Sequence, residues 1–160
     1  MREVTTQVEL VIDAPADRIW AYRLDFLHLP EYNASVEGME RVDAGDGAGV
    51  GATYRFDLVT GAHRSPVELR VTESVSGALV AIDMGGVLPA RERFTVSPVG
   101  GAGANDGPCL CAIALTLFVP DHFPEEGDPV LATNGEDQMQ SELVRMAEIL
   151  RTGGGEGHRG

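Results

Sequence analysis

The segments TYRFDLV at residues 53–59 and VELRVT at residues 67–72 decide the fold class of this 160-residue chain. Apolar side chains alternate with polar ones in both, as at Tyr54, Phe56 and Leu58 in the first segment. A period of two is typical of a β-strand with one buried face. The short connection between the segments contains Gly and Pro, which favour a turn. We therefore expect these two strands to form an antiparallel hairpin.

The strand pattern continues in both directions from this hairpin. On the N-terminal side it predicts strands at residues 4–13 and 36–42. On the C-terminal side it predicts strands at residues 78–84, 91–96 and 109–119, the last of which is the most continuously apolar. Turn-forming residues separate most of these strands at hairpin spacing. The pattern indicates an antiparallel sheet of seven strands.

Helical signals interrupt the strands near the N-terminus and replace them in the last third of the chain. Ile19 and Arg23 recur at helical spacing after Pro15, and residues 28–33 break this helix and open a second, short one. The segment 120–129 is acidic and rich in Pro, and we interpret it as a loop that is either fixed or a lid.

The long C-terminal helix is the second large element. Residues 133–136 (TNGE) fit a capping box, and the apolar side chains that follow repeat every three or four residues, typical of an amphipathic helix. Glycines from residue 153 are expected to end it. We therefore predict a single domain at residues 1–152 and a disordered Gly-rich tail at residues 153–160.

The predicted elements leave a space that could hold a ligand. One face of the sheet must be covered, and the C-terminal helix is the only element long enough to do so. A single helix cannot fill the concavity of a strongly curved seven-stranded sheet. A ligand would therefore bind between the helix and the sheet.

The charge and composition exclude several classes of function. The net charge is −13 and all basic residues are Arg, so binding to nucleic acids or to anionic membranes is disfavoured and a Lys Schiff base is impossible. The longest apolar runs fall short of the roughly 20 residues of a membrane span, and the N-terminus lacks the apolar stretch of a signal peptide. We expect a soluble, cytoplasmic protein, either a monomer or a homodimer.

Metal, nucleotide and flavin motifs are absent from the sequence, so no cofactor is expected. Cys109 and Cys111 lie two residues apart in a predicted strand, where they would point to the same face about 6.6–6.8 Å apart. This geometry is poor for a disulfide bond. We interpret both as buried structural thiols.

Several short motifs resemble the SRPBCC superfamily, which includes the Bet v 1-like and START-related proteins. The segment VELVIDAPADRIW at residues 8–20 resembles its opening strand and first helix, and Asp25 stands at the usual acidic position. LPEYN at residues 29–33 is similar to the second-helix signature, although the family often has Trp where this chain has Tyr32. GVGATY at residues 49–54 is similar to the turn into the third strand.

The resemblance covers nearly the whole domain and implies an α+β helix-grip fold. In this fold a curved seven-stranded antiparallel sheet wraps around a long C-terminal helix, with two short helices after the first strand. The superfamily includes ligand carriers, aromatic polyketide cyclases and aromatases, hydrolases and co-chaperone domains, so the fold does not select a function.

The resemblance also implies which side chains face the ligand. The concave face is the apolar one, and this fixes the register of each strand. For any single inward residue we favour a place in the plain core, whereas the geometry of the fold makes some members of the set cavity lining. The predicted ligand-binding residues are Tyr54, Phe56, Leu58, Leu69, Val71, Val80, Ile82, Met84, Phe94, Met139, Leu143 and Met146.

Few polar residues share this inward face. Glu92 alternates with Phe94, and burial among apolar groups would make its carboxyl a candidate general acid or base, with Tyr54 or His63 assisting. We favour the alternative that Glu92 is solvated or paired with Arg91 or Arg93, because Glu is rarely fully buried without a partner.

Three functions are compatible with these observations. The first is binding of a small hydrophobic or aromatic metabolite, lipid-like or polyketide-like, without chemical change. The second is a dehydrating enzyme of the polyketide cyclase or aromatase type. The third is a protein-interaction domain of the co-chaperone type, which we rank last because the outward strand faces are charged.

Overall fold

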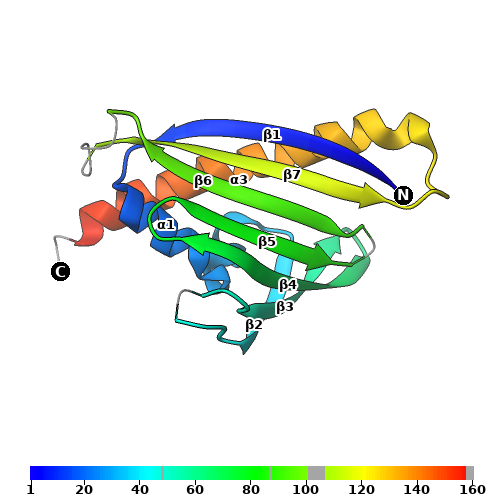
Figure 1. The fold of residues 1–160 in the computed structure, drawn as a ribbon, viewed down its shortest axis with the longest axis horizontal. Helices are drawn as coiled ribbons and strands as arrows, with labels where there is room; N and C mark the ends of the chain where they lie inside the picture. The colour runs from blue at the N-terminus through cyan, green and yellow to red at the C-terminus, as the bar shows by residue number, and fades with distance from the viewer. Residues whose placement is uncertain (48, 87, 101–106, 158–160) are drawn as a thin grey trace.

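The protein forms one curved sheet that packs around one long helix (Figure 1). The computed structural model describes residues 1–47, 49–86, 88–100 and 107–157, with side chains described to residue 151. The side chains of the predicted tail at residues 153–160 therefore lie outside the described part of the chain. The sheet is antiparallel, with the strand order β1-β7-β6-β5-β4-β3-β2. Its strands are β1 (Arg2–Ile12), β2 (Val36–Asp43), β3 (Thr53–Thr60), β4 (His63–Val75), β5 (Leu79–Gly85), β6 (Ala90–Pro98) and β7 (Cys109–Val119).

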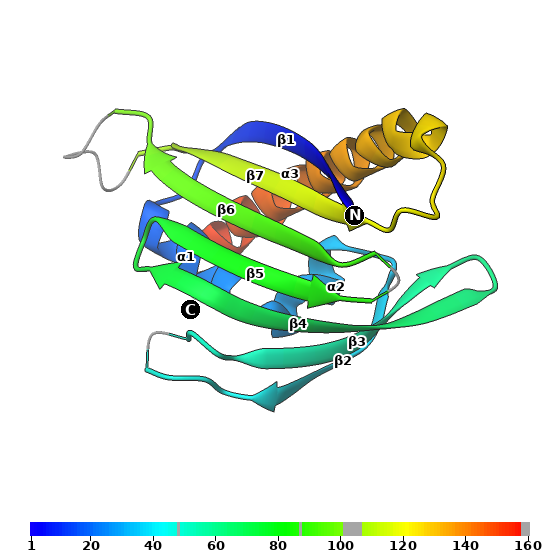
Figure 2. The same cartoon turned by 45° about the vertical axis from the view of Figure 1, so that its right-hand side comes forward.

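All seven predicted strands are present, and their order explains how the sheet is assembled. Each of the strands from β2 to β6 pairs with the next strand along the chain, as hairpin spacing predicts. The exception is β1, which pairs with β7 from the opposite end of the sequence, with Val8 opposite Ile113. This long-range pairing places the first strand at one edge of the sheet, beside the last (Figure 2).

The helices lie on the concave side of the sheet. Helix α3 crosses this side from the end at which β7 stops to the end at which α1 lies (Figure 1). The short helices after β1 cover the part of the concave side that α3 leaves open. The helical segments are α1 (Ala16–Leu24), η1 (Phe26–His28), α2 (Leu29–Tyr32), η2 (Glu125–Gly127) and α3 (Asp128–Gly157).

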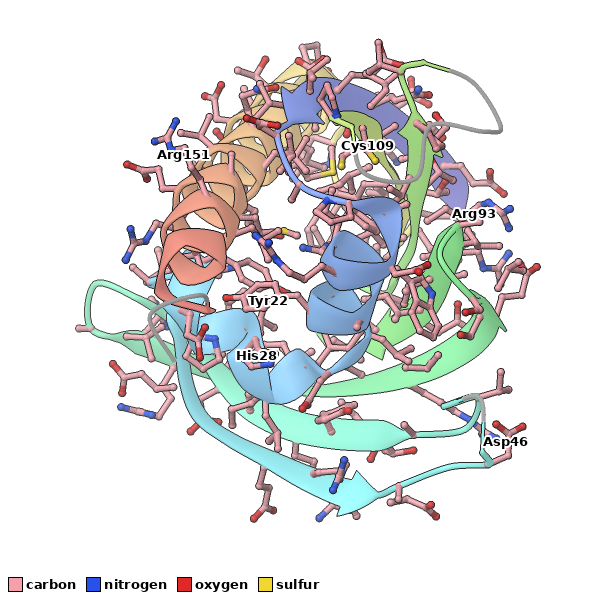
Figure 3. All side chains as sticks on the ribbon, turned by 90° about the vertical axis from the view of Figure 1, so that its left-hand side faces the viewer. Tyr22, His28, Asp46, Arg93, Cys109 and Arg151 are labelled. Carbon is pink, nitrogen blue, oxygen red and sulfur yellow. The ribbon has the colours of Figure 1, made fainter. Side chains whose placement is uncertain are left out.

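Strand alternation separates the two faces of the sheet. Along β6, Glu92, Phe94 and Val96 are buried on the concave side, whereas Arg91 and Arg93 are exposed on the convex side. The convex face carries ion pairs, such as Arg91 Nε to Asp83 at 3.1 Å and Arg93 Nη1 to Glu73 at 2.7 Å. Figure 3 shows Arg93 on this outer face. The charged outward faces expected from the sequence are therefore present.

Helix α1 is attached to both the sheet and α3. The Trp20 indole donates a hydrogen bond to the Leu79 carbonyl at 3.0 Å, and Arg18 donates one to the Leu150 carbonyl near the end of α3. These two contacts fix α1 across one end of the groove between sheet and helix.

Helix α3 is longer than the sequence predicts. It begins at Asp128 instead of residue 133, so the acidic segment 120–129 contains η2 and the start of α3 as well as a loop. Gly135 therefore lies inside the helix, where a Cβ would approach Leu115 Cδ2 to 3.3 Å and Thr6 Oγ1 to 3.4 Å. The predicted capping box is wrong, because residues 133–136 lie inside α3 and not at its start. Gly135 instead allows the helix to pack closely against β1 and β7.

The C-terminal end of α3 also differs from the prediction. The helix continues to Gly157, five residues beyond the predicted end at residue 152. Glycine lowers helix propensity by about 1 kcal/mol relative to alanine, but it retains the N–H that an α-helix requires. Among the described residues, no helix combines the length and the apolar character needed to cross a membrane.

Candidate functional site

A cavity of about 400 Å³ lies between the sheet and α3. Its volume falls within the usual range of about 300–1,000 Å³ for small-molecule sites. Apolar side chains from β3–β7 form most of its wall. The helical segments α1, η1 and α2, the segments after β5 and β7, and the first half of α3 complete it. The lining residues are Arg23, Phe26, Leu29, Asn33, Leu58, Ser65, Val67, Leu69, Ile82, Met84, Gly85, Gly86, Leu88, Ala90, Glu92, Leu115, Leu117, Phe123, Gly135, Gln138, Met139 and Glu142.

The cavity occupies only part of the groove between sheet and helix. On β6 its wall includes Ala90 and Glu92 but not Phe94, and on α3 it includes Met139 and Glu142 but not the following turn. We call the region around the cavity the open half of the groove. The remainder, filled by side chains that include Phe94, Ile113, Leu143 and Met146 at 0–1% exposure, is the packed half.

The predicted ligand-binding residues are divided between these halves. Leu58, Leu69, Ile82, Met84 and Met139 line the cavity. The other seven are buried in the core and do not form part of its wall: Tyr54, Phe56, Val71, Val80, Phe94, Leu143 and Met146.

The structure does not bring the three predicted catalytic residues together. Glu92 lines the cavity and is 7% exposed. Tyr54 is buried in the core with its ring edge against Phe26, at 5.7 Å between centroids, and burial raises the pKa of its hydroxyl. His63 is exposed at the first position of β4.

Glu92 belongs instead to a buried charge cluster, which we define as Arg23, Glu92 and Glu142. Arg23 from α1 donates through Nη2 to Glu92 and through Nη1 to Glu142 Oε1 at 3.3 Å. All three residues are at most 7% exposed and line the cavity. One guanidinium thus faces two carboxyl groups in an apolar environment.

This arrangement corrects the interpretation of Glu92 that we favoured from the sequence. Its partner is Arg23, while Arg91 and Arg93 pair with Asp83 and Glu73 on the convex face. The reason is strand alternation, since neighbours in the sequence point to opposite faces. A buried partner for Glu92 had to come from another element.

Aromatic rings hold the Arg23 guanidinium in place. Its central carbon lies 5.1 Å from the Phe94 ring centroid, 5.2 Å from that of Tyr32 and 5.8 Å from that of Phe26. These are cation–π distances. Desolvation lowers the pKa of Arg23, but Tyr32 and the two carboxyl groups outweigh it and the net shift is upward. Arg23 therefore remains protonated.

The carboxyl of Glu142 has a raised pKa. Desolvation raises its pKa, Arg23 opposes this rise, and Glu92 adds to it. Its Oε2 accepts hydrogen bonds from Asn33 Nδ2 at 2.9 Å and from Gln138 Nε2 at 3.3 Å. The Asn33 amide is oriented because its Oδ1 accepts from the Ser35 backbone N–H at 3.0 Å.

The sequence contained a signal for the residues that we did not predict. Arg23 lies four residues after Ile19 on the apolar face of α1, and Glu142 lies between Met139 and Met146 on the apolar face of α3. A charged residue on a buried helix face requires a partner. The elements that provide the partners become apparent only when the helices meet the sheet.

Other polar side chains near the helices are already engaged. The His28 ring stacks on Tyr22 at 4.4 Å, and both bond to Glu31, through His28 Nδ1 at 3.2 Å and Tyr22 Oη at 2.6 Å (Figure 3). Cys109 and Cys111 are free and buried, and burial raises the pKa of Cys111 to about 12. A thiol with such a pKa is unreactive at neutral pH.

The fold and its cavity define a helix-grip domain with a ligand-sized apolar site. The chain matches the family described as "Polyketide cyclase / dehydrase and lipid transport" over residues 1–151. It therefore belongs to this family, within the SRPBCC superfamily. None of the curated proteins compared with the chain matches it.

Solved structures with this fold are distant in sequence. A START superfamily protein from Mycobacterium smegmatis has a TM-score of 0.75 at 14% identity, covering 92% of this chain and 97% of its own. An aromatase/cyclase from Streptomyces sp. R1128 has a TM-score of 0.72 at 10% identity, covering 94% of each chain. A norcoclaurine synthase point mutant from Thalictrum flavum has a TM-score of 0.71 at 20% identity, covering 94% and 96%. These similarities establish the fold alone.

Proposed function

We propose that the protein binds a small hydrophobic or aromatic metabolite, lipid-like or polyketide-like, in the cavity between the sheet and α3. The observation that carries this proposal is a 400 Å³ cavity whose wall is mostly apolar yet includes a buried charge cluster. Apolar walls favour burial of a hydrophobic ligand, and a few polar groups orient it. The family includes lipid transport among its described functions.

The first test identifies the ligand without assuming its structure. Purified protein is incubated with a mixed library of apolar and aromatic metabolites, and the bound and free fractions are weighed by mass spectrometry. We expect a compound to be retained at unchanged mass, with a negative heat-capacity change on binding. Failure to retain any compound would contradict the proposal.

A matched pair of variants locates the binding site. Met139 lines the cavity, whereas Val144 is 46% exposed on the same helix. Met139→Trp should fill the cavity and abolish retention, while Val144→Trp should retain the ligand as the wild type does. Circular dichroism and melting show whether both variants fold. Retention by a folded Met139→Trp variant would place the ligand elsewhere.

A second function, dehydration of a cyclising ligand, is favoured by the position of the two carboxyl groups in the cavity wall. A raised pKa suits Glu142 to donate a proton. In such a step Glu92 would accept a proton from a ligand carbon, a carbon–carbon double bond would form, and the neighbouring C–O bond would break. The departing hydroxide would take the proton of Glu142 and leave as water.

The same library distinguishes the two functions. A compound that loses the mass of one water only with active protein would indicate the enzyme. Glu92→Gln should then abolish turnover and retain binding. Retained turnover in Glu92→Gln would remove Glu92 from the mechanism.

A further inference from the structure

The charge cluster has more acidic than basic groups, and this difference points to the kind of ligand. With both carboxyls ionised it carries one positive and two negative charges, all on side chains that line the cavity. A net charge in a buried, largely apolar site is costly unless a counter-charge compensates for it. Within the described residues, the cavity wall contains no cation other than Arg23.

One carboxylate oxygen of the cluster is left for a ligand. Glu92 Oε1 accepts from Arg23, but its Oε2 has no hydrogen-bond partner among the described residues. Among the described residues, the side-chain atoms that are both fully enclosed and without a partner are Thr6 Oγ1, Arg23 Nε, Tyr32 Oη and Ser74 Oγ. Glu92 Oε2 is not among them, so it is not fully enclosed. Since Glu92 lines the cavity, Oε2 remains accessible at the cavity surface.

Arg23, in contrast, is not available to an anionic ligand. Its Nη atoms contact Glu92, Glu142 and the Met146 sulfur, and its Nε is enclosed by protein atoms. Three aromatic rings surround the guanidinium. A ligand carboxylate at this end of the cavity would therefore meet two carboxyl groups without reaching the guanidinium of Arg23.

We propose that this cavity selects ligands by charge: an apolar or aromatic body with a protonated amine that donates to Glu92 Oε2, in preference to neutral analogues and against carboxylates. This inference rests on the proposed binding function and specifies the ligand's polar end. The ammonium supplies the missing positive charge. Such charge-assisted hydrogen bonds are roughly twice as strong as neutral ones.

In the absence of ligand, protonation of Glu142 would remove one negative charge from the cluster, and the raised pKa of this carboxyl favours that step. The groups that face Glu142 are Arg23 from α1, Glu92 from β6, Asn33 after α2 and Gln138 on α3 itself, with Tyr32 also facing Arg23. Burial raises the pKa of Glu142, which favours this protonated state. An incoming ammonium makes the ionised state favourable again. Amine binding below that pKa should therefore release a proton from the protein.

Four probes that share one naphthalene body test the proposal. They are 2-naphthylmethylamine, 2-naphthol, 2-methoxynaphthalene and 2-naphthoate, which present a cation, a neutral donor, an acceptor and an anion. Titration calorimetry should rank their affinities in that order, with at least a tenfold difference between the amine and 2-methoxynaphthalene. Repeating the amine titration in buffers of different ionisation enthalpy should show proton release.

A pair of isosteric variants separates the local charge from the overall charge of −13. Glu92→Gln should reduce the preference for the amine over 2-methoxynaphthalene by about tenfold and improve naphthoate binding. Glu73→Gln makes the same chemical change on the convex face, where Glu73 pairs with Arg93, and should leave the ranking unchanged. If Glu92→Gln fails to fold, Glu142→Gln tests the charge balance of the cluster instead: it removes the second carboxyl and should also reduce the preference for the amine.

The outcomes distinguish the two proposals. Similar affinities for all four probes, or tightest binding of naphthoate, would overturn charge selection and leave cavity binding intact. Equal effects of Glu92→Gln and Glu73→Gln would assign any preference to the overall charge and also overturn it. Failure of all four probes to bind would overturn the proposed function and this inference with it.

Discussion

The two halves of the groove share the same sheet and helix but differ in what fills them. The packed half is filled by large side chains such as Phe94, Ile113 and Met146. The open half leaves a cavity of about 400 Å³. Arg23 contacts both halves, since its guanidinium lies 5.1 Å from the Phe94 ring of the packed half and 5.8 Å from the Phe26 ring of the cavity wall.

The comparison indicates that the two halves of the groove have different roles. The packed half provides the tertiary contacts that stabilise the fold, which allows the open half to remain unfilled. The charge cluster lies at the boundary and gives the inner end of the cavity its polarity. The following predictions test this division, beginning with the largest expected effect.

Removing the cation from the boundary should destabilise the protein most. Arg23→Met leaves Glu92 and Glu142 buried without their partner, and breaking a buried ion pair typically costs about 3–5 kcal/mol. Urea unfolding measures the loss. Arg93→Met removes an exposed pair with Glu73 and should have little effect. Equal losses in the two variants would show that the cluster is not important for stability.

Truncation of a leucine should have different consequences in the two halves. Leu143→Ala in the packed half creates a new cavity and should cost about 2–5 kcal/mol. Leu117→Ala, on a half-buried residue of the cavity wall, enlarges existing space and should cost about 1 kcal/mol. Ligand affinity should change in Leu117→Ala only. The division between the halves would be wrong if the two losses were equal.

The pH dependence of stability should report the proton on Glu142. Because burial raises the pKa of Glu142 above its ordinary value of 4.5, the folded state holds this proton more tightly than the unfolded state. The resulting stability is present below 4.5 and is lost as the pH rises through the folded pKa.

The matching variant is Glu142→Gln, which cannot titrate at this position. Its free energy of unfolding relative to wild type should therefore increase as the pH rises, measured by urea unfolding between about pH 4 and pH 8. Parallel pH profiles for the two proteins would contradict a raised pKa at Glu142.

The smallest effects are expected at two tyrosines of the helical cover, each changed to phenylalanine. Tyr22→Phe removes the hydrogen bond to Glu31 and should cost about 1 kcal/mol. Tyr32→Phe removes a buried hydroxyl that has no hydrogen-bond partner among the described residues, so it should be neutral or stabilising. Thermal melting compares them directly, and the reverse order would contradict the hydrogen bonding described for these two hydroxyls.

The sequence by itself determined the elements and their faces. Alternation at Tyr54, Phe56 and Leu58 and the apolar spacing at Met139, Leu143 and Met146 are local patterns, and each follows from the geometry of a strand or a helix. These patterns were sufficient for seven strands, the long C-terminal helix and the family. They did not place the start of α3, because Gly135 lies inside the helix where it closely approaches β1 and β7, and a local pattern does not encode that contact.

Only the tertiary structure decided where the core ends and the cavity begins. Every inward residue has the same alternating pattern, and whether it packs or lines space depends on how far the opposite helix lies from it. The charge cluster has the same origin, since Arg23, Glu92 and Glu142 are brought together from three elements far apart in the sequence. Their pairing depends on distance in space, which a local pattern does not encode.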